Sequence, residues 1–116
     1  EIALRDPGAV KDAPILVLRG FPSGHFESSD EAGAPAAAAK RAAEGVLYKA
    51  KIPGKERWTC EWRIPFASLG IDPLKAAKLQ FNVSVRKSAG PDWVEWQGTG
   101  GSTWEVERAG VIELTR

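Results

Sequence analysis

Residues 58–87, WTCEWRIPFASLGIDPLKAAKLQFNVSVRK, carry the clearest structural pattern of the chain. Apolar and polar side chains alternate through residues 58–64, and the alternation returns through residues 78–86. A period of two is that of a β-strand that turns one face to a core and the other to solvent. The apolar positions are Trp58, Cys60, Trp62 and Ile64 in the first segment and Leu79, Phe81, Val83 and Val85 in the second. The pattern therefore predicts two half-buried strands, and it predicts that the thiol of Cys60 is buried and inert.

The residues between these two strands predict a tight bend with a short helical turn. Pro65 has a fixed φ and no N–H, so the first strand should end there at a corner. Gly70 can take a positive φ, which lets the backbone reverse its direction. Phe66 and Leu69 are expected to fill the corner with apolar side chains. This bend is expected to be architectural rather than chemical.

Five further segments have strand character and are separated by turn-forming residues. They are residues 1–4, 15–21, 46–52, 92–97 and 109–116. Residues 22–35 are rich in Ser, Gly, Pro and acids and are expected to form a loop. Residues 35–45, PAAAAKRAAEG, are typical of a helix, with proline in the first turn and glycine at a C-cap position. Because this helix lacks large apolar side chains, we expect it to lie on the surface.

These elements predict an all-β fold, an antiparallel β-sandwich with one short surface helix. At 116 residues the chain has the length of a single domain with one core, over residues 1–116. Its opening, EIALRD, begins directly on alternating apolar and polar residues. We therefore expect the chain to start within a strand of a larger module, with an open sheet edge that favours self-association.

The composition argues against several classes of function. The net charge is +1, so no strong field favours nucleic acid or an anionic membrane as a partner. No apolar run approaches the roughly 20 residues that span a bilayer, so we expect no membrane insertion. One histidine, one cysteine and no methionine leave too few ligands for a usual zinc site and too few axial ligands for a cytochrome-type haem.

Residues 58–87 also resemble the family 9 carbohydrate-binding modules and their DOMON-like relatives. The residues that carry the resemblance are Trp58, Glu61, Ile64, Pro65, Phe66, Ser68, Leu69, Gly70, Phe81, Asn82, Val83 and Val85. The closing AGVIEL, residues 109–114, is similar to the last strand of that family, and the opening EIAL is similar to a strand in the middle of its module. The resemblance therefore implies that the family's N-terminal strands are absent from this chain. The alanine-rich segment and the ILVLRG region depart from the family pattern.

The resemblance implies a non-catalytic module that binds poly- or oligosaccharide and targets a larger secreted or cell-envelope protein to glycan. No cofactor is implied, apart from a structural calcium ion that family members often hold. Two other interpretations stay open. One is a structural accessory sandwich without a ligand. The other is a haem-binding, DOMON-like electron-transfer domain, which the lack of methionine disfavours.

The tryptophans of residues 92–106, DWVEWQGTGGSTWEV, are the first candidates for sugar binding. The axial hydrogens of a pyranose form an apolar face that suits an aromatic plane. Strand alternation places Trp93 outward, and it places Trp96 with Val94 on the inward side, in the core or at its rim. Trp104 follows a glycine-rich loop, and with Trp93 it forms the preferred stacking pair. The alternative is that all three tryptophans pack against the edge of the sandwich.

The polar faces of the two best strands supply the other candidates, because sugar hydroxyls need fixed donors and acceptors. These residues are Glu61, Arg63, Asn82 and Arg86, which we expect to line one sheet surface together. The alternative is a solvated face with cross-strand ion pairs, such as Glu61 with Arg86.

Four acidic residues are candidate calcium ligands: Asp6, Glu27, Asp30 and Asp92. No EF-hand spacing relates them, and the alternative is that they belong to solvated loops.

Overall fold

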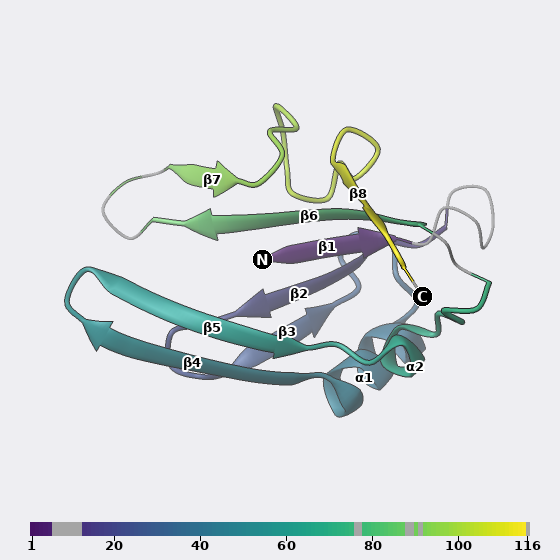
Figure 1. Cartoon of the computed structure of the whole chain (residues 1–116), viewed down its shortest axis with the longest axis horizontal. Coiled ribbons are helices and arrows are strands. Elements are labelled where there is room, and N and C mark those ends of the chain that lie inside the picture. The colour runs from purple at the N-terminus through teal and green to yellow at the C-terminus, as the bar shows by residue number, and fades with distance from the viewer. Residues whose placement is uncertain (6–12, 76–77, 88–89, 91, 116) are drawn as a thin grey trace.

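The longest strand, β6 (Lys78–Arg86), organises the larger of two antiparallel sheets. In this computed structural model residues 1–5, 13–75, 78–87, 90 and 92–115 are described. One side of β6 pairs with β1, and the other pairs with both β7 and β8. The sheet order is β3-β2-β1-β6-β7, with β8 also on β6 (Figure 1). The other strands of this sheet are β1 (Ile2–Arg5), β2 (Leu16–Gly20), β3 (Phe26–Ser29), β7 (Trp93–Glu95) and β8 (Gly110–Glu113).

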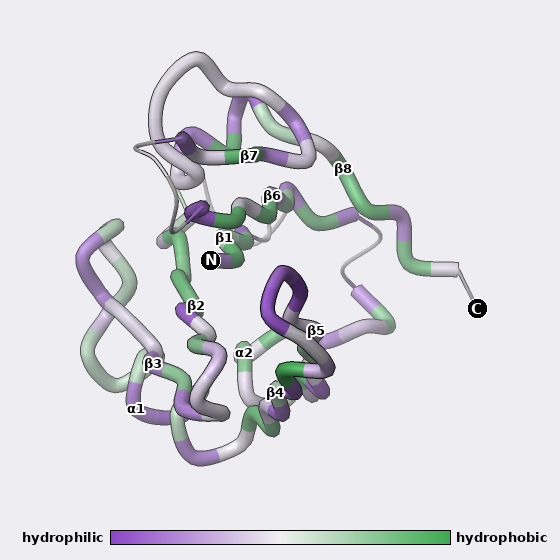
Figure 2. Tube along the Cα trace, turned by 90° about the vertical axis from the view of Figure 1, so that its left-hand side faces the viewer, coloured by the Kyte–Doolittle hydropathy of each residue, from purple (hydrophilic) through white to green (hydrophobic). Residues whose placement is uncertain are grey.

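The second layer is a long hairpin of β4 (Leu47–Gly54) and β5 (Arg57–Arg63), which pair with each other only. Figure 2 shows this hairpin lying across from the curved row of strands formed by β7, β6, β1 and β2. Helices α1 (Ala36–Gly45) and α2 (Phe66–Leu69) lie together at one end of the two layers (Figure 1). The expected all-β antiparallel sandwich is confirmed.

Strand register divides the larger sheet into two faces. Ile2 pairs with Leu18 and Val83, and these three side chains therefore share the face toward the hairpin, the inner face. Ala3 pairs with Val17 and Asn82, which share the opposite, outer face. The hairpin and the helices cover part of the inner face, and the loop between β7 and β8 covers part of the outer face. Both of these coverings contribute residues to the candidate site.

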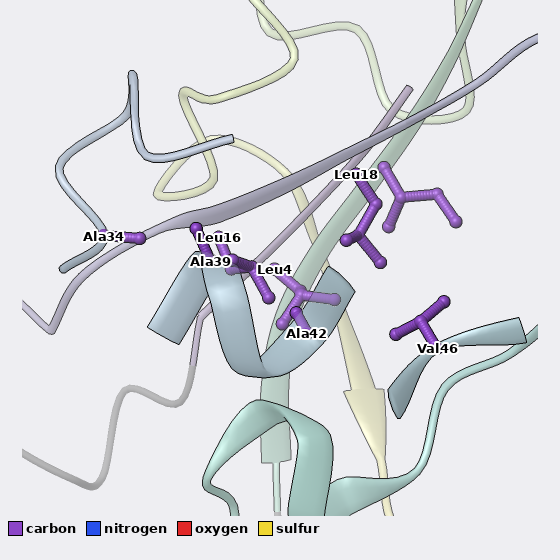
Figure 3. Close-up of a cluster of buried hydrophobic side chains, with 8 residues drawn as sticks. Leu4, Leu16, Leu18, Ala34, Ala39, Ala42 and Val46 are labelled. Atoms are coloured by element: carbon purple, nitrogen blue, oxygen red, sulfur yellow. The ribbon is translucent and has the colours of Figure 1, made fainter. Parts of the chain in front are cut away.

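The main core lies between the inner face and the helices. Its buried residues are Ile2, Leu4, Leu16, Leu18, Ala34, Ala39, Ala42 and Val46. In Figure 3, Ala39 and Ala42 lie on the side of α1 that faces the leucines of β1 and β2. Alanines at the contact let the helix approach closely, and Ala42 is completely buried. The surface helix is thus firmly packed rather than lying loosely on the sheet.

Two local predictions need correction. Residues 22–35 were expected to form a loop, but they contain β3, where Phe26 packs against the rings of Tyr48 and Trp62. Gly45 was expected at a C-cap, but it ends α1 with Val46 as the cap. A Cβ at Gly45 would collide with Ser68 of α2, so this glycine is needed for the close approach of the two helices.

The bend after β5 is as predicted. Pro65 follows the strand and is the N-cap of α2, and Gly70 ends that helix in the left-handed region with φ of 69°. Phe66 and Leu69 pack with the buried Ile71 and Leu79. The corner therefore joins the end of the hairpin layer to the start of β6.

The ring of Tyr48 of β4 packs at a tilt against that of Trp62 of β5, with 4.3 Å between ring centroids. The hydroxyl of Tyr48 donates a hydrogen bond to the carbonyl of Phe21 at 2.9 Å. This contact ties the hairpin to the end of β2. Burial, together with the neighbouring thiol of Cys60, raises the pKa of Tyr48 to about 12.

We predict that the single tyrosine titrates with a midpoint near pH 12 in the folded protein. An unfolded tyrosine has a pKa of about 10, so the neutral phenol is favoured by folding. That stabilisation is fully present below about pH 10 and is lost as the pH rises through about 12. Tyrosinate absorbance measures the titration midpoint, and circular dichroism at the same pH values measures whether the fold is intact. A midpoint near 10 while the fold is intact would contradict the buried environment of Tyr48.

Candidate functional site

The outer face of the sheet is covered by the loop between β7 and β8, residues 96–109, which we call the C-terminal loop (Figure 1). Asn82 of β6 is completely buried beneath it. Its side-chain amide donates to the carbonyl of Gln97 at 3.1 Å, and its side-chain oxygen accepts from the N–H of Gln97 at 3.2 Å. Ser84 is 2.7 Å from the hydroxyl of Thr103. These bonds fix the start and the middle of the loop to one strand.

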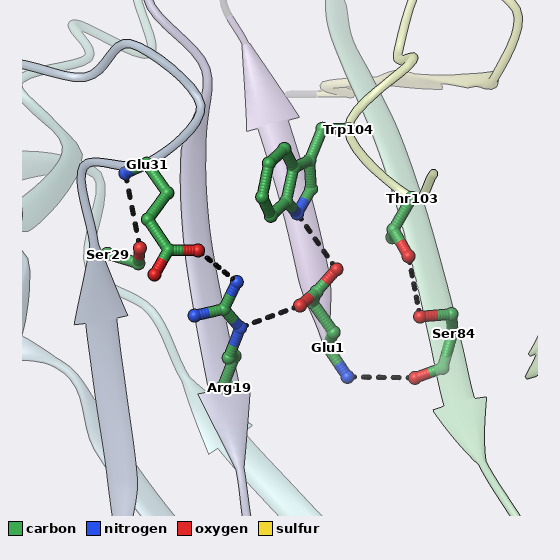
Figure 4. Close-up of polar contacts among 7 residues, drawn as sticks. All are labelled: Glu1, Arg19, Ser29, Glu31, Ser84, Thr103 and Trp104. Atoms are coloured by element: carbon green, nitrogen blue, oxygen red, sulfur yellow. Dashed lines mark hydrogen bonds and ion pairs between the residues drawn. The ribbon is translucent and has the colours of Figure 1, made fainter. Parts of the chain in front are cut away.

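A second set of polar contacts fixes the position of Trp104 (Figure 4). The carboxylate of Glu1 accepts hydrogen bonds from Trp104 Nε1 at 2.9 Å and from Arg19 Nε at 2.8 Å. Arg19 also donates to Glu31 at 2.7 Å and lies over the indole of Trp104, 5.7 Å from the ring centroid. The two carboxylates raise the pKa of Arg19, and the Arg19 guanidinium lowers the pKa of Glu31. Trp104 is therefore held by its N–H and by one face of its ring.

Beside this network is a cleft of about 1040 Å³. It extends around the start of β1, past which both β6 and the β4–β5 hairpin continue (Figure 1). It is lined by Glu1, Ile2, Arg19, Gly20, Phe21, Pro22, Glu56, Trp58, Cys60, Trp62, Val83, Ser84, Val85, Arg86, Lys87, Trp93, Glu95 and residues 101–104. Its size lies at the upper end of the usual range for ligand-binding clefts.

Four of the five tryptophans line this cleft. Trp58 and Trp62 come from β5, Trp93 from β7 and Trp104 from the C-terminal loop. Trp93 is 51% exposed, whereas the other three are half-buried. Trp93 is thus the aromatic ring most available to a ligand.

The charged groups of the cleft differ in the partners that they already have. Glu95 accepts hydrogen bonds from the N–H of Thr99 at 3.0 Å and from its hydroxyl at 3.3 Å. Arg86 and Lys87 are exposed and form no ion pair within the described part of the chain. Arg86, on the same face as Trp93, is therefore a cation of the cleft without an ion-pair partner among the described residues.

Of the residues singled out in the sequence, Trp93, Trp104 and Arg86 meet in the cleft. Glu61 and Arg63 do not, because they lie on the opposite face of β5 from the cleft-lining Trp58 and Trp62. The expectation that Glu61 and Arg86 share one sheet surface is wrong, since β5 and β6 belong to different sheets.

Trp96 and Asn82 also lie outside the cleft. Trp96 faces the inner side, where it contacts Phe81 edge-on at 5.8 Å between ring centroids. It is 57% exposed, because the hairpin layer does not extend over β7, so it lies at the rim and not in the core. Asn82 is structural, since both ends of its amide are used by the backbone of Gln97.

The cleft includes residues that the sequence pattern assigned to the core. Cys60 was expected to be buried, but it is exposed and lines the cleft. The alternation of β5 correctly groups Cys60 with Trp58 and Trp62. It does not reveal that the opposite layer leaves this part of β5 uncovered. Arg19 was also missed, because its partners Glu1 and Glu31 are distant in sequence. Glu95 was missed as well, because its contact with Thr99 depends on a loop conformation that the sequence pattern does not reveal.

The candidate calcium ligands do not converge. Within the described residues no group of three or more acidic, histidine or cysteine side chains could hold a metal ion. Glu27 lies 3.7 Å from His25 Nε2, Asp30 and Asp92 are exposed, and Asp6 lies outside the described residues.

The described helices include none long and apolar enough to cross a bilayer. No protein-family model, no curated protein and no solved structure matches this chain.

We predict that Asn82→Ala lowers the free energy of unfolding by about 2–4 kcal/mol. It removes two partly buried hydrogen bonds and leaves the N–H and carbonyl of Gln97 without these partners. Chemical denaturation measures the loss. Glu61→Ala, on the exposed face of β5, is the control and should change stability by no more than about 0.5 kcal/mol. An Asn82→Ala protein as stable as this control would show that Asn82 does not anchor the loop.

Proposed function

We propose that this chain is a non-catalytic carbohydrate-binding module, which belongs to a larger secreted or cell-envelope protein and attaches it to glycan. The observation that carries the proposal is a cleft that four tryptophans line from two sides, Trp93 and Trp104 from the outer face of the larger sheet and Trp58 and Trp62 from the hairpin, with the ring of Trp93 exposed. The resemblance of residues 58–87 to family 9 carbohydrate-binding modules supports the same function.

The chemistry of the cleft suits a sugar better than a purely apolar ligand. A pyranose has an apolar face of axial hydrogens and a rim of hydroxyls. Trp93 offers a plane for the first, and Arg86, its cross-strand neighbour on the same face, is a donor for the second. Two of the three cleft carboxylates, Glu1 and Glu95, hold Arg19, Trp104 and Thr99 in place, which agrees with a binding role without catalysis; the third, Glu56, comes from the turn of the hairpin.

We predict that Trp93→Ala weakens sugar binding at least about tenfold while the fold stays intact, as expected for truncation of an exposed aromatic anchor. Tryptophan fluorescence and calorimetry with a panel of soluble neutral and acidic oligosaccharides measure the affinity. Trp96→Ala is the matched control, because Trp96 is similarly exposed but lies outside the cleft. It should retain the affinity of the unmodified protein.

The outcomes separate binding from a purely structural role. A folded protein that binds no sugar of the panel would favour the structural accessory domain. Equal losses in the Trp93 and Trp96 variants would place binding outside the cleft. A visible Soret band on the purified protein would instead favour the haem-binding alternative.

A further inference from the structure

We infer that the cleft selects an acidic sugar, a uronic acid whose ring stacks on Trp93 while its carboxylate pairs with Arg86. This inference rests on the proposed carbohydrate binding and adds the class of sugar. It is carried by the juxtaposition, on the outer face of the sheet, of one exposed indole and one exposed guanidinium that forms no ion pair with a described residue.

The two side chains are direct cross-strand neighbours. Arg86 of β6 pairs with Trp93 of β7 in the antiparallel register, so their side chains leave the sheet on the same side. The Cβ atoms of such a pair are about 4.5–5.5 Å apart. A uronic acid carries its carboxylate on the edge of the ring, so a ring stacked on Trp93 can direct that carboxylate toward the neighbouring strand.

The other charges around the cleft leave Arg86 available. The carboxylate of Glu1 is shared by Arg19 and Trp104. Glu95 lies diagonally across from Arg86 in the register, yet its carboxylate is turned to Thr99. Glu56 also lines the cleft, but it comes from the turn of the β4–β5 hairpin in the other layer. Lys87 also lines the cleft, but strand alternation places it on the face opposite Arg86.

The form of the cation favours a carboxylate. A guanidinium presents parallel N–H donors that match the two oxygens of a carboxylate, and such charge-assisted pairs are about twice as strong as neutral hydrogen bonds. A hydroxyl of a neutral sugar can accept one of these bonds but brings no charge. The expected discrimination between an acidic sugar and its neutral ester is therefore about tenfold or more.

The test compares oligogalacturonates and oligoglucuronates with their methyl esters, which keep the ring and lose the charge. Calorimetry on the unmodified chain should show at least one acid bound about tenfold more tightly than its ester. Added salt should reduce this difference. Arg86→Gln should abolish the preference for the acid. Arg63→Gln is the control, because Arg63 is also exposed but lies on the face of β5 that does not line the cleft. This variant should keep the preference for the acid.

Each outcome has a separate meaning. If the acids and esters bind equally, or only neutral sugars of the panel bind, the acidic specificity is wrong while carbohydrate binding stands. If a preference for the acid survives in Arg86→Gln, the carboxylate is recognised elsewhere and the inference is overturned. If no sugar binds to the folded protein, both the specificity and the proposed function fail. Even if a variant does not fold, the comparison of acid with ester on the unmodified protein tests whether the cleft prefers an acidic sugar.

Discussion

The buried amide of Asn82 is the interaction on which the rest of the candidate site depends. Without it, the outer face of β6 would present polar side chains to solvent, as the alternation of residues 78–86 suggests. Instead, paired hydrogen bonds to Gln97 hold the C-terminal loop against the sheet, and the Ser84–Thr103 contact holds it again further along. A buried amide with all its partners is stable, but one that loses them is costly, so the loop has few alternative positions. This is why Thr103 and Trp104 can form a wall of the cleft.

The cleft itself follows from the unequal extent of the two layers. The larger sheet has six strands and the hairpin layer has two, so the hairpin and helices cover only β1, β2, β3 and the start of β6. Beyond that cover, apolar side chains of the inner face stay exposed, among them Val85 and Val94. The aromatic side of β5 faces the same uncovered region and contributes Trp58 and Trp62. The shorter second layer thus turns residues with a core pattern into one side of the cleft, while Trp93, Arg86 and Trp104 line it from the outer face of the larger sheet.

Local patterns in the sequence were enough to predict the class of the fold. The alternation in residues 58–64 and 78–86 predicted β5 and β6, and Pro65 and Gly70 predicted the corner between them. Pairing between distant strands could not be predicted, because it depends on the packing of the whole chain. For that reason Glu61 was placed with Arg86, although the two belong to different sheets. Predictions of burial from the alternation were wrong for the same reason. Cys60, expected in the core, is exposed, and Asn82, expected on a polar face, is buried.

The two tryptophans proposed as a stacking pair have different roles once their partners are known. Trp104 is held through its N–H by Glu1 and through its ring by Arg19, so it is a fixed wall. Trp93 has a charged cross-strand neighbour, Arg86. The carboxylate nearest to Arg86 in the register is that of Glu95, and it accepts a hydrogen bond from Thr99. The hydrogen bonds that shape the loop therefore also keep a cation unpaired beside an exposed ring. An exposed Glu95–Arg86 ion pair would add little stability, whereas the two hydrogen bonds from Thr99 satisfy a half-buried carboxylate and shape the loop. The geometry of the loop therefore accounts for the unpaired Arg86, and the proposed acidic sugar would use that cation.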